Sequence, residues 1–551
     1  EASASKTVRS EALETETSLP NFRQGDAIIL YERNRDTDNV TNKMVFKGNI
    51  EYLTENEISI RLRATQQNPS VLPAESLYAI EHDTMDTTFR SMYQGLYIYL
   101  SARKERRDLL LSQRPPRFDE SLDSMISRSE DDFTRIALKA KAAQDYFLLI
   151  GPPGTGKTSC ALKKMVETFH ADKDAQILLL SYTNRAVDEI CKSLASIAPA
   201  VDFIRVGSEL SCDEAYRGHL IENELSSCNR RSEVYERIRN CRIIVGTVAA
   251  ISGKPELFRL KHFDVAIIDE ATQILEPQLL GILCARGEDG KDAIDKFVLI
   301  GDHKQLPAVV QQNTEQSAIY DESLLSIGLT NLKDSLFERL YRNCTATVHR
   351  SYDMLCRQGR MHPEVALFAN RAFYGGRLIP VGLPHQIESS DTICRLAFYP
   401  SVPEKAGASA KINYSEARIV ADLAARIYED HQTDFDESRT LGIITPYRSQ
   451  IALIKKEIES LGIPVLNRIL VDTVERFQGS ERDVIIYSFC VNYPYQLKFL
   501  SNLTEEEGVL IDRKLNVALT RARKQMFITG VPELLERNPL YKSLLKLIES
   551  F

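Results

Sequence analysis

The sequence has no tryptophan, no cysteines at Cys-x-x-Cys spacing and no long apolar stretch. A bilayer takes about 20 consecutive apolar residues, and no run approaches that length, so we expect no membrane partner. The ten cysteines are scattered, which argues against a zinc site or a disulfide framework and favours reduced thiols in an intracellular protein, cytoplasmic or nuclear. Because the chain has no tryptophan, any aromatic side chain that stacks on a ligand must be tyrosine or phenylalanine.

The chain also lacks an excess of positive charge. Its 69 basic and 77 acidic side chains give a formal net charge of −8, so a surface that binds a polyanion would have to be local. A basic cluster at Arg103, Lys104, Arg106 and Arg107 fits either a solvated helix face or a nucleic-acid contact. The length of 551 residues is enough for about three or four structural units.

Residues 151–158 read Gly-Pro-Pro-Gly-Thr-Gly-Lys-Thr, the spacing of a phosphate-binding loop. An apolar run at 146–150 precedes it and a helix-compatible run at 159–169 follows, so the glycine-rich turn lies between an expected strand and an expected helix. Its backbone N–H groups and the helix N-terminus would hold phosphate oxygens. We expect Lys157 to reach the β- and γ-phosphates of a nucleoside triphosphate and Thr158 to bind Mg²⁺. The expected nucleotide contacts are Gly151, Pro152, Gly154, Thr155, Gly156, Lys157, Thr158 and Ser159.

A second strand ends in two carboxylates, Asp269 and Glu270, after the apolar run 265–268. A triphosphate site needs one carboxylate to hold Mg²⁺ and another to deprotonate the attacking water. Asp269 suits the first role and Glu270 the second. Gln305 follows the next expected strand, at 297–300, where it could sense the γ-phosphate.

Along the chain, the pattern divides into a tail at 1–20, a set of short β-type runs to about residue 82 that suggests a small β-barrel, and a helical segment from 83 to 125. Strands then alternate with helices, which favours parallel, doubly wound sheets. We expect two α/β domains, at 126–345 with a helical insertion near 208–240 and at 346–551; only the first has a phosphate loop. The expected strands of the domains are 146–150, 177–180, 243–245, 265–268, 297–300, 441–444, 484–489 and 526–529.

Several further motifs lie in order after the phosphate loop, and together they are highly specific. The series resembles the superfamily 1 helicases, in the branch that holds the nonsense-mediated-decay RNA helicase and the replication helicase-nuclease. The motifs are Asp269-Glu270-Ala271-Thr272-Gln273, Gly301-Asp302-His303-Lys304-Gln305-Leu306-Pro307, Arg360-Met361-His362-Pro363, Thr445-Pro446-Tyr447-Arg448, Gln478-Gly479-Ser480-Glu481 and Asn516-Val517-Ala518-Leu519-Thr520-Arg521-Ala522-Arg523.

The resemblance implies two RecA-like P-loop domains in tandem, preceded by the small β-barrel and a helical stalk, with ATP and Mg²⁺ bound between the domains. Arg360 and Arg521 match arginines that the family aims at the γ-phosphate, where each could stabilise transition-state charge. Arg523 fits a packing role equally well. Gly479 and Glu481 match positions beside the ribose and phosphates. A nuclease or other domain is compatible with the stretch before Glu1, whereas the segment itself has no nuclease motif and is expected to be a monomer.

The resemblance also assigns single-strand contacts, to DNA or RNA, on both domains. Small hydroxyl and amide groups there would hold phosphates without reading sequence, and Tyr447 could stack on a base. The matching residues are Thr183, Asn184, Arg185, Gly246, Thr247, Thr445, Pro446, Tyr447, Arg448 and Thr473.

Two departures from the family concern the nucleotide base. The customary glutamine one short helix ahead of the first strand is missing from 127–141, and Gln144 is close to the strand. Gly359 stands where the family usually has a base-stacking tyrosine. We therefore expect weak selection among ATP, GTP, CTP and UTP; Arg357, Gln144 or a residue near Phe133 could restore a base contact.

The leading interpretation is an ATP-dependent helicase or translocase that moves 5′ to 3′ on single-stranded nucleic acid. One alternative is a nucleic-acid-stimulated NTPase that strips proteins without unwinding. Another is an NTP-dependent switch or binding module, against which the second α/β domain and the paired arginines argue.

Overall fold

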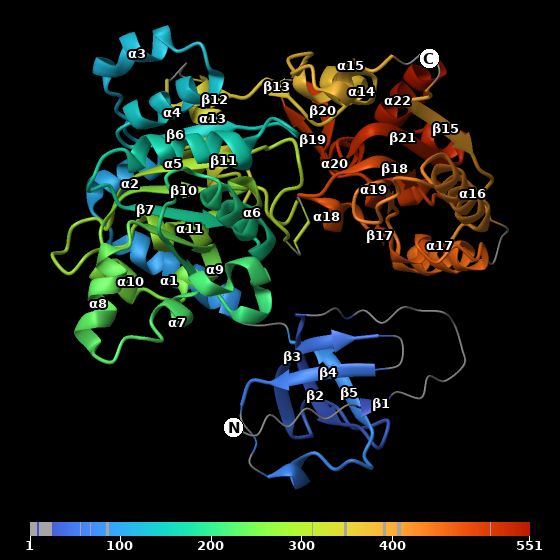
Figure 1. Ribbon diagram of the computed structural model, residues 1–551, viewed down its shortest axis with the longest axis horizontal. Coiled ribbons are helices and arrows are strands. Elements are labelled where there is room, and N and C mark those ends of the chain that lie inside the picture. Colours follow the sequence, from blue (N-terminus) through green and yellow to red (C-terminus); the bar gives the residue numbers. More distant parts are fainter. Residues whose placement is uncertain are drawn as a thin grey trace.

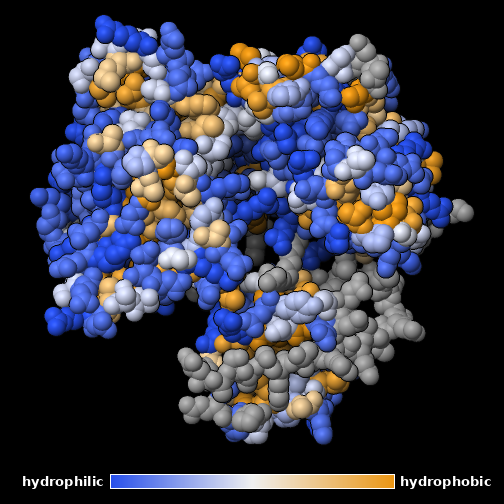
Figure 2. Space-filling model, in the orientation of Figure 1, coloured by the Kyte–Doolittle hydropathy of each residue, from blue (hydrophilic) through white to orange (hydrophobic). Residues whose placement is uncertain are grey.

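The computed structural model describes residues 8–9, 22, 25–54, 57–64, 66, 68–83, 87–310, 312–313, 315–346, 350–389, 393–404, 409–506 and 508–550 (Figure 1). The tail expected at 1–20 lies outside these residues except for a two-residue strand, β1 (Val8–Arg9). Among the described residues, no helix combines the length and the apolar character needed to cross a bilayer. The space-filling view shows a predominantly hydrophilic face with separate apolar patches (Figure 2).

The amino-terminal part is an antiparallel sheet of five described strands in the order β1-β4-β3-β2-β5. Alternate residues of its strands face a small core of Ile28, Leu30, Phe46 and Ile50. Among the described strands, the hydrogen-bonded pairs join neighbours in that order, with β1 and β5 at the two ends of the sheet, so barrel closure stays a prediction. The strands after β1 are β2 (Ala27–Glu32), β3 (Val45–Leu53), β4 (Glu57–Leu62) and β5 (Tyr78–His82).

Separate helices follow in the part of the chain where a helical segment was expected, at 83–125. Helix α1 (Thr87–Ser101) ends before Ala102, and α2 (Lys104–Leu110) begins after Arg103. Helix α1 packs closely on α11 (Glu276–Leu283). A Cβ added to Gly95 would lie 2.2 Å from the Pro277 carbonyl oxygen, so this crossing requires glycine.

The first α/β domain is built on seven described strands in the order β12-β6-β11-β10-β7-β9-β8, all paired in parallel. Successive residues of β6 pack into different cores: Leu148 lies in one cluster and Leu149 in the other. Both faces are therefore covered, as in a doubly wound sheet. The strands are β6 (Tyr146–Ile150), β7 (Ile177–Ser181), β8 (Phe203–Val206), β9 (Ile243–Thr247), β10 (Phe263–Ile268), β11 (Ile294–Gly301) and β12 (Tyr352–Met354).

Strand β12 corrects one expected boundary. It pairs with β6 although it lies beyond residue 345, where we expected the second domain to begin. The first sheet therefore extends to Met354, because the chain returns to the edge of this sheet before it crosses over. The helices of this part are α3 (Asp123–Arg128), α4 (Asp132–Ala142), α5 (Lys163–His170), α6 (Asn184–Ala195), α7 (Ile221–Glu224), α8 (Arg231–Asn240), α9 (Val248–Ser252), α10 (Glu256–Leu260), α12 (Glu322–Ser326) and α13 (Leu336–Ala346).

The second α/β domain is built on five described parallel strands in the order β15-β21-β18-β16-β17. Two apolar clusters again pack on its faces. Figure 1 shows the two α/β domains side by side, with the antiparallel sheet set apart from both. The strands are β15 (Leu396–Pro400), β16 (Leu441–Ile444), β17 (Leu470–Asp472), β18 (Arg482–Ser488) and β21 (Ala522–Gly530).

Two small strand pairs lie outside this sheet: β13 (Arg357–Gln358) with β14 (Ile379–Pro380), and β19 (Leu503–Glu506) with β20 (Val509–Asp512). The second of these pairs forms a hairpin that reaches the first domain, as described below. The helices of the second domain are α14 (Pro363–Tyr374), α15 (Pro384–Ile387), α16 (Tyr414–Asp430), α17 (Arg448–Ser460), α18 (Val474–Phe477), α19 (Leu497–Leu500), α20 (Arg513–Leu519), α21 (Pro532–Leu535) and α22 (Pro539–Glu549).

Candidate nucleotide and nucleic-acid site

The glycine-rich loop connects the end of β6 to a helical turn that continues into α5. Gly154 and Gly156 have φ of +73° and +75°, in the left-handed region that favours glycine. A Cβ added to Gly154 would lie 2.4 Å from the Cβ of Arg360, so Arg360 lies directly against the loop. The loop therefore has the left-handed glycine backbone that a phosphate-binding turn needs.

Lys157 folds back over the loop, and its Nζ donates a hydrogen bond to the carbonyl oxygen of Gly151 at 2.5 Å. Burial lowers the pKa of Lys157, and the carboxylates of Asp302 and Asp269 oppose this effect. Because Arg360 and Glu270 are also electrostatic neighbours of Lys157, the structure brings these expected site residues together around the loop.

Thr158 and Asp269 meet across the loop and the end of β10. The Thr158 hydroxyl donates to Oδ2 of Asp269 at 2.5 Å, and Asp269 is 1% exposed. Burial raises the pKa of Asp269, whereas the bond from Thr158 lowers it. A hydroxyl and a carboxylate that converge on one point are hard oxygen ligands, which suit Mg²⁺.

Glu270 follows Asp269 with a φ of +54°, uncommon for a residue other than glycine and a form of strain that gathers at functional sites. Burial, reinforced by the charge of Asp269, raises the pKa of Glu270 to about 7. Lys157 and Arg521 oppose that shift, so they lie close to the carboxyl group. A carboxyl in this position has the basicity of a general base near neutral pH.

The segment 302–305 makes several contacts with the second domain. Gln305 Oε1 accepts from Nη2 of Arg521 at 3.2 Å, and Asp302 Oδ2 accepts from the Tyr374 hydroxyl at 2.7 Å. Asn516 donates to the Lys304 carbonyl oxygen at 2.7 Å. Further contacts are His303 with Glu506 of the β19–β20 hairpin (3.1 Å) and Lys304 with the Phe373 carbonyl oxygen (2.8 Å).

Arg360 and Arg521 have different hydrogen-bond partners. Arg360 Nε donates to Glu481 Oε2 at 2.5 Å, while Arg521 is 2% exposed and also donates to the Val517 carbonyl oxygen. Burial, with the nearby charge of Arg360, lowers the pKa of Arg521 to about 9. Arg521 therefore still carries its charge at neutral pH.

The segment 479–481 contacts the arginines of the second domain. Gly479 has a φ of +78°, and Glu481 accepts from Arg360 and lies 3.7 Å from Arg523. Burial opposes ionisation of Glu481, but the charge and hydrogen bond of Arg360 and the charges of Arg523 and Arg521 together outweigh it, so the pKa of Glu481 is lowered overall. Arg523 also lies 3.5 Å from Asp483.

The expected single-strand residues lie at the carboxyl end of β9 or just after the ends of β7, β16 and β17. In the first domain, the hydroxyls of Thr183 and Thr247 accept bonds from the first turns of α6 and α9, while Asn184 is half-buried and Arg185 exposed. Gly246 is buried within β9. The accessible side chains here are therefore those at the start of α6.

In the second domain, Arg448 is exposed, Pro446 and Thr473 are half-buried, and Thr445 is fully buried. Tyr447 is half-buried. Its ring packs against the apolar core of the domain, and its hydroxyl accepts from Nε2 of Gln496 at 3.1 Å, so its side chain is only partly exposed. Sequence reasoning did not identify Gln496, because no motif marks it.

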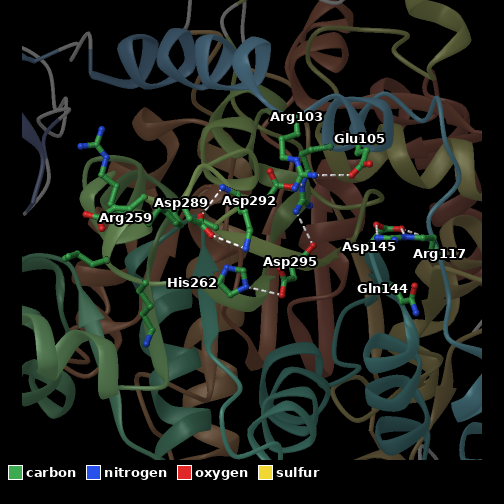
Figure 3. A pocket seen from close by; sticks show the side chains of 18 of the residues that line it. Arg103, Glu105, Arg117, Gln144, Asp145, Arg259, His262, Asp289, Asp292 and Asp295 are labelled. Atoms are coloured by element: carbon green, nitrogen blue, oxygen red, sulfur yellow. Dashed lines mark hydrogen bonds and ion pairs between the residues drawn. The ribbon is translucent and has the colours of Figure 1, made fainter.

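A cavity of about 740 Å³ lies elsewhere, at the amino ends of β6, β10 and β11 (Figure 3). Asp145 accepts bonds from Arg114 and Arg117 there, and His262 pairs with Asp295 at 3.0 Å. Gln144 lines this cavity, at the opposite end of the sheet from the loop. Gln144 is therefore not a reader of the nucleotide base, which removes one of the expected alternatives.

The comparisons with known proteins agree with the motifs. Two family models, both described as "AAA domain", match residues 128–234 with 221–313 and residues 332–533. The DNA replication ATP-dependent helicase/nuclease JHS1 of Arabidopsis thaliana is 28% identical over 98% of this chain and 40% of its own length. The corresponding DNA2 of Bos taurus is 27% identical over 97% of this chain and 50% of its own.

A third relative is the DNA polymerase alpha-associated DNA helicase A of Saccharomyces cerevisiae, which is 24% identical over 83% of this chain and 73% of its own length. The chain thus spans half or less of the length of the helicase/nuclease relatives that it matches.

Proposed function

We propose that this chain, which belongs to the superfamily 1 helicases in the branch of the replication helicase-nuclease and the nonsense-mediated-decay RNA helicase, hydrolyses ATP to move along single-stranded nucleic acid. The observation that carries the proposal is the contact of Arg521, on the second domain, with Gln305 beside the phosphate loop of the first. A cleft closed by residues from both sides changes shape when the γ-phosphate is lost. The names of the relatives favour DNA as the strand.

In this proposal the two α/β domains are tandem RecA-like domains, and the antiparallel sheet with α1 and α2 forms the barrel and stalk that the family places ahead of them. ATP lies on the loop between Gly151 and Ser159, with Gly479 and Glu481 beside the ribose and phosphates. The 5′-to-3′ direction of travel is taken from the family resemblance and is part of the proposal.

The residues around the loop have different roles in hydrolysis. Mg²⁺ held by Thr158 and Asp269 would neutralise charge on the β- and γ-phosphates. The Glu270 carboxylate takes the proton of the attacking water, and its raised pKa makes it a better acceptor than an exposed glutamate. Lys157, Arg360 and Arg521 stabilise the charge that develops on the phosphoryl oxygens.

The single strand crosses the carboxyl ends of both sheets. Thr183, Asn184, Arg185, Gly246 and Thr247 supply contacts from the first domain. The segment 445–448 and Thr473 supply them from the second. Binding across both domains favours the closed cleft, in which Arg521 is in place, so strand binding and hydrolysis are coupled.

The test combines ATP turnover with strand displacement. Turnover should rise sharply when single-stranded DNA is added, and a duplex with a 5′ tail should be unwound in preference to one with a 3′ tail. Lys157→Ala is the control, since loss of the phosphate contact should abolish both signals. Turnover that is indifferent to single strands would favour a nucleotide-dependent switch. Stimulated turnover without unwinding would favour a remodelling NTPase.

A further inference from the structure

A short segment after β18 presents aromatic side chains beside the strand-binding motif of the second domain. Tyr495 is 54% exposed and Phe499 is 68% exposed, in a chain where large apolar side chains are mostly buried. The Tyr495 ring stacks on Tyr493, with centroids 5.7 Å apart and planes at 14°, and meets the Phe499 ring edge-on at 6.5 Å. We call the three rings of Tyr493, Tyr495 and Phe499 the aromatic platform.

The platform lies next to the segment 445–448. Strands β16 and β18 are paired neighbours, with Ile444 opposite Tyr487, so the residues that follow them leave the sheet together. Gln496, inside the platform segment, donates to the Tyr447 hydroxyl at 3.1 Å. The platform is therefore at the same end of the sheet as Arg448 and Thr473.

A buried amide network holds the platform in place. Gln496 is 2% exposed; its Oε1 accepts from the backbone N–H groups of Asn492 and Tyr493, at 2.9 Å each, and its Nε2 also donates to the Ala410 carbonyl oxygen. The buried Asn492 side chain donates in turn to the Ile412 carbonyl oxygen at 2.7 Å. Exposed rings on a fixed backbone bind with little loss of conformational entropy.

Tyr447, the residue expected to stack on a base, is half-buried, with its ring packed on the core and its hydroxyl bonded to Gln496. The rings that do face solvent are those of Tyr495 and Phe499, and the exposed ammonium group of Lys498 lies between them in sequence. An aromatic face flanked by a cation is the combination that binds single-stranded nucleic acid without reading its sequence.

We propose that Tyr495 and Phe499 stack on bases of the single strand as it passes the second domain, with Lys498 near its backbone and Tyr447 serving to position the platform through Gln496. This inference rests on the proposed function, because it assumes that a strand crosses this end of the sheet. It adds a base-stacking site outside the motif residues. The site is sequence-tolerant, since every base has a face to stack.

The test compares binding of a labelled dT₁₂ oligonucleotide and an abasic oligonucleotide of the same length. In the unsubstituted chain, dT₁₂ should bind more tightly than the abasic strand. Tyr495→Leu with Phe499→Leu keeps apolar surface but removes both rings, and should weaken dT₁₂ binding by about tenfold or more, since stacking contributes about 1–3 kcal/mol per base. Abasic binding should change little. Tyr495→Phe should retain affinity, and Tyr93→Ala, at a tyrosine of α1 that is 74% exposed, is the matched control.

Photo-crosslinking gives an independent readout. An oligonucleotide that carries 5-iodouracil should crosslink to Tyr495 or Phe499 in the unsubstituted chain. Three results would each contradict base stacking by the platform while leaving the proposed strand binding in place. The leucine variant could bind dT₁₂ as tightly as the unsubstituted chain, or it could lose the same affinity for dT₁₂ and for the abasic strand. The third such result is a crosslink at Tyr447 alone. If the unsubstituted chain binds neither oligonucleotide, the proposed function fails and the platform fails with it.

Discussion

Arg521 donates from Nη2 to Oε1 of Gln305 at 3.2 Å, and this bond joins the two α/β domains beside the phosphate loop. Gln305 is held in turn, because its Nε2 donates to Oδ2 of Asp302 at 2.7 Å. The arrangement indicates that Gln305 positions Arg521 rather than acting alone.

The first prediction follows from that bond. Arg521→Ala should lower kcat for ATP hydrolysis by at least about 100-fold, since an arginine that stabilises a transferring phosphoryl group contributes about 10³–10⁵. Gln305→Ala should lower kcat by about tenfold or more with little change in KM. The double variant should be no slower than Arg521→Ala, because Gln305 acts through Arg521 and has nothing left to position once Arg521 is removed.

Steady-state kinetics of the three variants with saturating single-stranded DNA provide the measurement. Arg523→Ala is the control, at an arginine on β21 that pairs with Glu481 and Asp483 rather than with Gln305. Additive losses in the double variant would mean that the two residues act separately.

The second prediction concerns the proposed base. Glu270→Gln keeps the size of the side chain and removes the proton acceptor, so hydrolysis should fall by about 100-fold or more, the least that a positioned base contributes. Nucleotide affinity should be nearly unchanged, whereas Lys157→Ala should weaken it. Titration with a fluorescent ATP analogue, run beside the hydrolysis assay, separates the two effects. Normal turnover in Glu270→Gln would show that Glu270 is not the general base.

The strands that the sequence predicts best are those buried on both sides. Runs such as 146–150 and 265–268 are continuously apolar because both faces of a parallel sheet are covered, and the structure places β6 and β10 there. Strand β8 was missed because its four residues include Arg205, which is buried against Asp188. Strand β17 has only three residues, too few for a periodic pattern.

The chemistry of the site could be predicted because loop, carboxylates and arginines lie in recognisable motifs. Which of these residues contact one another could not be predicted. Gln305 and Arg521 are 216 residues apart, and whether they meet depends on how one domain is placed on the other. The half-buried state of Tyr447 could not be predicted from the sequence either, because its hydroxyl is bonded to Gln496, which the motif does not include.

The third prediction is weak selection among nucleotide bases. A Cβ added to Gly359 would lie 3.3 Å from Leu383 Cδ1 and 3.4 Å from Val381 Cγ2, so this position is lined by aliphatic groups. Phe133 lies at the loop, with its ring 3.4 Å from a Cβ added to Gly156. Aliphatic and aromatic surfaces contact a base without reading the hydrogen-bonding groups on its edge.

We therefore expect GTP, CTP and UTP to support hydrolysis within about tenfold of ATP, a difference of about 1.4 kcal/mol. The measurement is kcat/KM for the four nucleotides under one set of conditions. A preference for ATP of about 100-fold or more, twice that free energy, would require a residue that reads adenine, with Arg357 the first to substitute.

The last prediction uses a buried acid outside the site. Glu416, on α16, is fully buried, and its Oε2 accepts from the Ser488 hydroxyl at 2.6 Å and from the Cys490 backbone N–H at 2.8 Å. Burial raises the pKa of Glu416 from 4.5 to about 7, although these bonds oppose the shift. The folded chain therefore holds this proton more tightly than the unfolded chain does.

Between about pH 4.5 and 7 the folded state binds more protons than the unfolded state, so stability falls as pH rises and levels off above about 7. The loss from this one group is about 3 kcal/mol. Glu416→Gln is uncharged at every pH and should match the unsubstituted chain near pH 5 but unfold at a Tm several degrees higher near pH 8, since 1 kcal/mol moves Tm by about 2–4 °C in a domain of this size. Glu429→Gln, at an exposed glutamate of the same helix, should leave the pH dependence of Tm unchanged. A Glu416→Gln curve parallel to that of the unsubstituted chain would show that Glu416 is already ionised in the folded protein well below pH 7.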